Sequence, residues 1–502
     1  MIYFLSVWAI SFVRMVGKDL QNKALNGIKW SLVDNVANSG ITFLVGLVLA
    51  RLLSPIEFGI IGIVTIFINL SNTIVDGGFI TALVRKPNVD DKDLNTVYYS
   101  NLFVSILLSV FLSFASKWLS EFFELPILLK IIPIMSSLLI INALSLIHKT
   151  LLVIRIDFKT QALVSFIASV LSGIVGISLA YYGYGVWSLV VQQILRQTLL
   201  MLLFGISSKW SPSLLFSISR FKDLFNFGSK ILLANLINSI YKDIFLVVIG
   251  KMYTATDLGQ YNRAEQFNSI FTNNLTLVIQ KVMLPVLSKM QDNKLLLQNA
   301  FKKVLNYSGF VTFILVFALS AVAKPFVILL VGEQWLPAVE YLQIMCCYGA
   351  IYPLQIININ LLNVLKCSDK VLKLEVIKKI LFLGVIASGF IFELKYMLWF
   401  AVIYYYIEFI LNSWYSEKLI GFGTFKQIKS LFPYWFVSIV ISLIVWSISL
   451  LDISYAVMLF VQCLVLVALY LIYYELKKDS VYLELKMLFL NQLKEVFNGT
   501  KN

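Results

Sequence analysis

Long apolar stretches alternate with short polar segments along almost the whole chain. Apolar runs of roughly 20 residues match the thickness of the hydrocarbon layer when they form α-helices. The pattern therefore predicts fourteen membrane-spanning helices joined by short loops. The predicted spans are 30–50, 56–76, 97–115, 126–147, 161–182, 185–205, 229–250, 258–282, 304–323, 338–363, 374–392, 396–416, 433–451 and 454–474.

Composition supports the same fold class. Hydrophobic residues make up 59% of the 502 residues, and charged residues only 14%. A single soluble core stops growing near about 250–300 residues, so a soluble fold could not bury this much apolar chain. We expect an all-α polytopic membrane protein.

The net charge of +14 is a signal of membrane topology. With the N-terminus placed in the cytoplasm, 32 of the 41 Lys and Arg residues lie on the cytoplasmic side, and five lie outside. The other four, Lys130, Arg196, Lys242 and Arg263, are assigned to the interiors of spans. Basic residues concentrate in cytoplasmic loops of membrane proteins, so both termini are predicted to be cytoplasmic. No nucleic-acid partner is implied.

Two similar turns lie 200 positions apart, ARLLSPIEFG at 50–59 and GKMYTATDLG at 250–259. Each connects the first two helices of one half of the chain. Both turns should face the same side of the membrane, which requires an even number of helices between them. The predicted number is six. This predicts two parallel six-helix lobes related by a pseudo-two-fold axis along the membrane normal. The matched pairs are Arg51 with Lys251, Ser54 with Thr254, Glu57 with Asp257, and Gly59 with Gly259.

The predicted organisation follows from this repeat. The segments are a cytoplasmic N-terminal segment 1–28, an N-lobe 29–205, a cytoplasmic amphipathic linker 206–228, a C-lobe 229–416, two further helices in 417–476 and a cytoplasmic tail 477–502. Residues 1–13 could be a signal peptide. A start-site ambiguity is favoured, because Met15 opens a basic lead-in, so translation of residues 1–14 stays open.

Charged and amide side chains concentrate between Phe227 and Lys281, inside apolar stretches. An ionised group at bilayer depth costs on the order of 3 kcal/mol, so such groups normally face a wet cavity or a partner. The helices that start each half are therefore predicted to line one cavity. Interhelical hydrogen bonds and internal salt bridges are the alternative. The candidate lining residues are Asp34, Asn38, Asp76, Asn235, Asn238, Asp243, Asn262, Glu265, Asn268 and Asn273.

Arg263 and Lys242 are the candidate ligands for a diphosphate or another anion. A guanidinium stays charged when partly desolvated, and its fork binds phosphate oxygens bidentately. The carboxylates could neutralise these cations or bind a coupling H⁺ or Na⁺. Glu408, beside Tyr404–Tyr406, is as consistent with packing as with function. No resident cofactor or metal is expected.

Two polar segments are assigned to the cytoplasmic surface. The acidic segment VDDKDLNT at 89–96 is expected to be a solvated turn. The basic, amphipathic segment LLFSISRFKDLFNF at 214–227 is expected to lie on the lipid surface. There is no Walker loop and no GxGxxG motif. We therefore expect a protein that is not an enzyme.

Several stretches resemble the polysaccharide flippases of the multidrug/oligosaccharidyl-lipid/polysaccharide exporter superfamily, in the branch that exports O-antigen, colanic acid and teichuronic acid. The resemblance covers most of the first 370 positions, and the last four spans match only in pattern. The segments that carry it are ARLLSPIEFG (50–59), DGGFITALVRK (76–86), YGYGVWSLVVQQ (182–193), FNFGSK (225–230), DLGQYNRAEQF (257–267) and FVILLVGEQWLPAVEYLQI (326–344).

The resemblance implies a transporter that flips undecaprenyl-diphosphate-linked oligosaccharide units across the bacterial cytoplasmic membrane. Arg263 matches the family's arginine in the eighth span, which would engage the diphosphate. The first span offers Asp34 without an arginine, and Lys242 is the candidate substitute. We expect a monomer with membrane lipid and lipid-linked oligosaccharide as partners. A polysaccharide polymerase and a chain-length regulator are further candidate partners.

Two rival functions stay open. An ion-coupled multidrug or small-molecule antiporter would share the fold, and would need a cation-binding carboxylate in the N-lobe, where Asp34 and Asp76 are the candidates. A membrane-embedded polysaccharide polymerase or ligase would usually need a large outer loop with arginines. No outer loop in this sequence is that long.

Overall fold

The computed structural model describes residues 40–86, 88–155, 157–487 and 490. All regular secondary structure in these ranges is helical. Eleven helical segments of this part of the chain are long and apolar enough to cross a membrane. The predicted fold class, an all-α polytopic membrane protein, is thereby confirmed.

Three of the fourteen predicted spans are not among these eleven segments. Helices α10 (Ala255–Lys289) and α14 (Ser368–Ser388) coincide with predicted spans but are more polar than the eleven. The helix Gly40–Leu52 covers the second half of the first predicted span, 30–50. The count of fourteen therefore stays a prediction.

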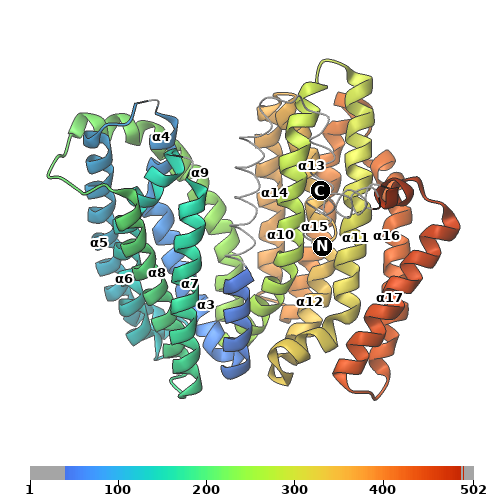
Figure 1. Ribbon diagram of the computed structural model, residues 1–502, viewed down its shortest axis with the longest axis horizontal. Coiled ribbons are helices and arrows are strands. Elements are labelled where there is room, and N and C mark those ends of the chain that lie inside the picture. Colours follow the sequence, from blue (N-terminus) through green and yellow to red (C-terminus); the bar gives the residue numbers. More distant parts are fainter. Residues whose placement is uncertain (1–39, 87, 156, 488–489, 491–502) are drawn as a thin grey trace, which may run out of the picture. The chain divides into compact units, whose positions relative to one another are not determined.

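The chain divides into two compact units, one that reaches Asn262 and one that starts at Arg263. In the first unit, α5, α6, α8 and α7 lie side by side in that order (Figure 1), and α9 packs on α3. Its described helices are Gly40–Leu52, α3 (Pro55–Asp76), α4 (Phe79–Arg85), α5 (Asp91–Phe122), α6 (Leu128–Ile154), α7 (Phe158–Tyr181), α8 (Val186–Ser208), α9 (Ile218–Met252) and the start of α10.

The second unit is built on α11 (Lys294–Val331), which packs against α12, α16 and α17. A short 3₁₀ turn, Glu333–Trp335, follows the left-handed Gly332 and leads into α12. The predicted span 338–363 is thus two successive helices. The other helices of this unit are α12 (Leu336–Gly349), α13 (Tyr352–Val364), α14, α15 (Leu394–Ile420), α16 (Thr424–Ser447), the 3₁₀ turn Ile448–Leu450 and α17 (Tyr455–Lys477).

The two compact units differ from the predicted lobes in where they divide the chain. Helix α9 belongs to the first unit, whereas the sequence analysis placed its span, 229–250, in the C-lobe. The compact units are defined by contacts between helices, whereas the predicted lobes are defined by the repeated turns. The lobe limits at 205 and 229 therefore stay a prediction.

The two repeated turns form equivalent helix caps. At the start of α3, the backbone N–H of Ser54 donates to Glu57 Oε2 at 2.6 Å. At the start of α10, the backbone N–H of Thr254 donates to Asp257 Oδ2 at 3.1 Å, and the N–H of Asp257 donates back to the threonine hydroxyl. Such reciprocal bonds satisfy N–H groups that a helix start leaves without partners. The local similarity of the repeat is thus confirmed.

The same turns bring α3 and α10 into backbone contact. A Cβ added to Gly59 would lie 1.6 Å from the carbonyl oxygen of Ala255, and one added to Gly259 would lie 1.9 Å from that of Pro55. Each helix start thus rests on the glycine of the other. The glycine at the end of each repeated turn allows this approach because it has no side chain.

We expect Gly59→Ala to destabilise the folded protein, because the new methyl group would meet backbone, which no side-chain rotation can relieve. Overpacking of this kind costs about 1–3 kcal/mol. The measurement is the melting temperature of the protein purified in detergent. Gly205→Ala is the control, since a Cβ there meets nothing within 4 Å. Equal melting temperatures of the two variants would contradict the close crossing.

Candidate functional site

Arg263 is held in a buried environment in the third turn of α10. Its side chain is 3% exposed. Nη1 donates to Gln266 Oε1 at 2.6 Å, and the guanidinium carbon lies 4.9 Å from the ring centroid of Trp335. Trp335, in the turn after Gly332, is fully buried. A guanidinium over an indole face is stabilised by the ring quadrupole.

The Arg263 guanidinium is therefore buried among the packed helices of the second unit. Arg has five N–H donors in a planar fork, a geometry that matches the oxygens of carboxylates and phosphates. The anion-binding role of Arg263 stays a prediction.

The neighbouring candidates on α10 point to different surroundings. Glu265 accepts a hydrogen bond of 2.9 Å from the Tyr348 hydroxyl. Asn268 is buried, and a Cβ at Gly349 would lie 2.5 Å from its Oδ1. Asn273 is exposed, and the half-buried Asn262 lies against Gly62 in the first unit. Glu265 thus bonds to a neighbouring helix and Asn268 packs against one, and their assignment to a cavity stays a prediction.

The candidates on α9 form a stripe. Asn235, Asn238 and Lys242 are exposed and lie at spacings of three and four, which places them on one face of the helix. Asp243 is turned away from that face and is buried. Beside this stripe α9 contacts α3, where the Thr73 and Ser239 hydroxyls are 3.4 Å apart. Lys242 is exposed and Asp243 is buried, and the two side chains interact electrostatically.

Asp76 ends α3 at a turn of two glycines. Its Oδ1 accepts the N–H of Ile80 at 3.5 Å, and Gly77 and Gly78 both have positive φ angles. This side chain therefore supports the turn into α4. Asp34 and Asn38 lie outside the described residues.

A buried ion pair that the sequence analysis did not predict joins α14 and α15. Lys378 is 4% exposed, and its Nζ lies 3.1 Å from Glu408 Oε1. Glu375, one turn before it, is bonded to the same Nζ. The count of basic residues had treated Lys378 as part of a cytoplasmic segment. The signal was Glu408 itself, since a carboxylate in an apolar span requires a cation nearby.

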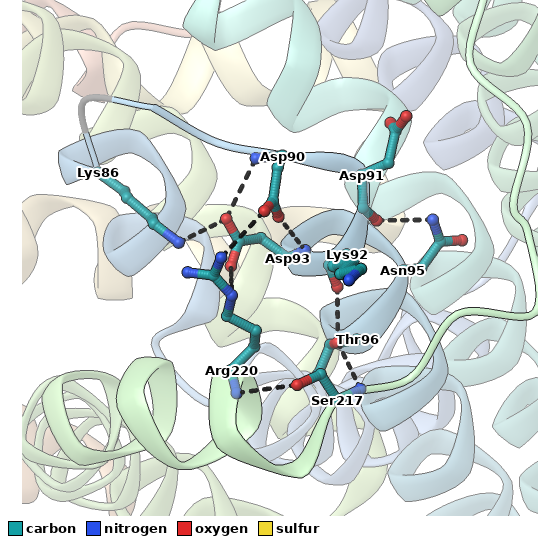
Figure 2. Close-up of polar contacts among 9 residues, drawn as sticks. All are labelled: Lys86, Asp90, Asp91, Lys92, Asp93, Asn95, Thr96, Ser217 and Arg220. Carbon is teal, nitrogen blue, oxygen red and sulfur yellow. Dashed lines mark hydrogen bonds and ion pairs between the residues drawn. The ribbon is translucent and has the colours of Figure 1, made fainter.

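A second polar cluster joins α4, α5 and α9 (Figure 2). Asp93 is fully buried, and its Oδ2 lies 2.5 Å from Lys86 Nζ. Asp90 caps α5 by accepting the N–H of Asp93 at 2.8 Å, and Arg220 of α9 bonds to Asp90 at 3.1 Å. The expectation of a solvated turn at 89–96 is therefore wrong, because the turn is a helix cap closed by two cations.

The same cluster lowers the pKa of Asp90. The backbone N–H of Asp93 is the main cause, with Arg220 and Lys86 adding to it. Each favours the charged carboxylate over the neutral acid. Around these groups lies a cavity of about 350 Å³. The residues that line it are Ala82, Arg85, Lys86, Asp93, Arg220, Asp223, Leu224 and Phe227.

The segment before α9 is fixed to α5. The N–H of Ser217 donates to the Thr96 hydroxyl at 3.2 Å, and the N–H of Ser213 donates to Asn95 Oδ1 at 2.7 Å. Leu224 packs into the core of the first unit, whereas Leu214 is exposed. The amphipathic segment predicted at 214–227 is thus partly the packed first turns of α9.

The sequence matches a family model described as polysaccharide biosynthesis protein over residues 48–340. It is 23% identical over 333 residues to the teichuronic acid biosynthesis protein TuaB of Bacillus subtilis, covering 66% of this chain and 69% of that protein. It is 26% identical over 310 residues to the succinoglycan biosynthesis transport protein ExoT of Rhizobium meliloti, covering 61% of this chain and 62% of ExoT.

The fold is similar to that of two kinds of solved transporter. A structure of the lipid II flippase MurJ in an inward closed conformation aligns with a TM-score of 0.71 at 17% identity, covering 90% of this chain and 100% of MurJ. An inward-facing multidrug resistance MATE transporter aligns with a TM-score of 0.60 at 15% identity, covering 83% and 98%. At these identities, both comparisons show a similarity of fold alone.

We expect Asp93→Asn to destabilise the first unit. The buried amide would still accept one hydrogen bond but would leave Lys86 and Arg220 without their shared anion. Both cations are partly exposed, so the expected cost is about 1–3 kcal/mol, as for a lost hydrogen bond to a charged group. The measurement is thermal unfolding in detergent. Asp91→Asn, two residues away and exposed, is the control. A similar loss in both variants would rule out the buried contact as the cause.

Proposed function

Because this chain belongs to the polysaccharide biosynthesis protein family, we propose that it translocates undecaprenyl-diphosphate-linked oligosaccharide repeat units across the bacterial cytoplasmic membrane. The translocated units would serve the synthesis of a surface polysaccharide, such as O-antigen, exopolysaccharide or capsule. The mechanism is alternating access, in which the two halves of the transporter expose one site to each side of the membrane in turn.

The proposal rests on the agreement between the names of the sequence relatives and the function of a protein with the same fold. Relatives named for the biosynthesis of teichuronic acid and the transport step of succinoglycan biosynthesis match the sequence. A lipid II flippase shares the fold over nearly the whole chain. A lipid-linked sugar is the one type of substrate that would fit both a flippase and a polysaccharide biosynthesis pathway.

The proposed site uses the predicted residues. Arg263 and Lys242 bind the diphosphate, because both are cations on helices that coincide with predicted spans. Asn235 and Asn238 share an exposed stripe with Lys242 and offer amide groups to sugar hydroxyls. The prenyl chain stays in the lipid. Asp34, Asn38 and Asp76 are assigned to the same cavity in the N-lobe.

The proposed setting follows the distribution of basic residues. Both termini lie in the cytoplasm, and the protein acts as a monomer without a resident cofactor and is not an enzyme. A proton or Na⁺ gradient supplies the energy. A polymerase and a chain-length regulator receive the translocated unit on the outer side.

An ion-coupled multidrug antiporter is the second candidate, and the fold likeness to the MATE transporter favours it. Such an antiporter binds cationic, aromatic compounds and needs an acidic, aromatic site. The exposed stripe of α9 is instead cationic and rich in amides. This chemistry favours an anionic, glycosylated ligand.

The first test is the sidedness of lipid-linked oligosaccharide in cells that lack this chain. We expect complete repeat units to accumulate in the inner leaflet, where an impermeant glycosidase added outside cannot reach them. Inverted vesicles should make them accessible. Finished but unpolymerised units on the outer leaflet would favour a polymerase. Unchanged lipid-linked sugars would favour the antiporter.

The second test is Arg263→Ala, which should abolish surface polysaccharide while membrane insertion stays normal. Loss of a bidentate guanidinium contact costs about 1.5–3 kcal/mol, which is tenfold or more in rate. Arg263→Lys should recover only part, because an ammonium lacks the fork. Lys251→Ala, which breaks an exposed pair with Glu124, is the control. Full display by a well-expressed Arg263→Ala variant would refute the diphosphate assignment.

A further inference from the structure

The pair formed by Lys378 and Glu408 lies halfway along its helices. Lys378 is ten residues from either end of α14, about 15 Å at the rise of an α-helix. Glu408 is 14 residues from the start of α15 and 12 from its end. Helix α15 is one of the segments apolar enough to cross a membrane. Ionisable side chains at such depth are rare and mark ion and proton pathways.

The pair belongs to a larger cluster of titratable groups in the second unit. Glu375 and Lys379 of α14 and Tyr404 of α15 interact with members of the pair. Tyr352 of α13 interacts electrostatically with both Glu408 and Glu265 of α10, so Glu265 extends the cluster.

Stacked tyrosines connect this cluster to α10. Tyr405 contacts Tyr404 with ring centroids 5.4 Å apart, and it stacks on Tyr348 at 4.7 Å. The Tyr348 hydroxyl donates to Glu265, two residues from Arg263. Protonation at Glu408 would therefore change the electrostatics of the packed layer that leads to the proposed diphosphate ligand.

The composition of the cluster selects a proton over a metal cation. The position between the two carboxylates is already filled by the ammonium of Lys378, which bonds to both. A Na⁺ ion there would meet a like charge and would have to displace a covalently attached cation. A proton needs no such space, because it binds directly to a carboxylate oxygen.

We propose that Glu408 and Lys378 form the proton-binding site that couples a proton gradient to transport, which rests on the proposed function. A proton from the outer side binds Glu408, forms its O–H bond and ends the ion pair. Lys378 keeps its own proton and its contact with Glu375. When the site opens to the cytoplasm, the proton leaves, the carboxylate is restored and the pair re-forms. One proton thus moves inward in each cycle.

A purely structural pair makes a different prediction. Buried ion pairs can be replaced by apolar residues of similar volume without loss of stability. The double variant Lys378→Met with Glu408→Leu should therefore fold whichever role the pair has. A structural pair predicts that this variant transports normally, whereas a coupling site predicts that it folds but has lost its dependence on the pH gradient.

The test uses the full chain in proteoliposomes, with undecaprenyl-diphosphate-linked oligosaccharide extracted from the producing strain as the probe. For the wild type with one proton per cycle, a pH difference of one unit should change the steady-state ratio between leaflets by about tenfold. Glu408→Gln and the double variant should reach a ratio near one at any pH difference. Glu408→Asp should keep the dependence, and Lys426→Met, which breaks an exposed pair, is the control.

The outcomes separate this inference from the function on which it rests. If the wild type moves no probe under any gradient, the proposed function fails. If it moves the probe and follows a Na⁺ gradient, or if Glu408→Gln and the double variant keep the wild-type response to pH, the proton site is refuted while the flippase stands. Melting temperatures of all variants in detergent show whether each is folded.

Discussion

A charged side chain among apolar helices is stable only with a partner, and this constraint organises the polar chemistry of the chain. Arg263 is packed between an amide and an indole. Lys378 is bonded by two glutamates. At the start of α5, buried Asp93 is balanced by two cations from other helices. In each case the partners come from segments that must pack correctly first, so the charges also specify the packing.

The repeated turns give the first unit its second constraint. Equivalent caps start α3 and α10, and each helix rests on a glycine of the other. A contact made by backbone against backbone leaves no room for side-chain adjustment.

The proposed function accounts for both the buried cation and the buried ion pair of the second unit. A transporter for a lipid-linked anion needs fixed cations, and it needs a titratable group that an external gradient can reach. Arg263 and the pair of Lys378 with Glu408 supply one of each, on helices of the same unit, with stacked tyrosines between them. Under the two proposals, transport of the anion and binding of the proton would be linked through these packed side chains.

The sequence by itself determined the membrane fold class and the repeated turns. It also singled out Arg263 as a charged residue within a predicted span. Hydropathy and capping act locally, so they can be interpreted without knowing which helices are neighbours. It did not determine the partner of Glu408 or the burial of Asp93. Those depend on which helix faces which, through contacts such as that between α4, α5 and α9, and only the tertiary structure decides them. Burial of a charge depends on neighbours distant in the chain, which no local pattern contains.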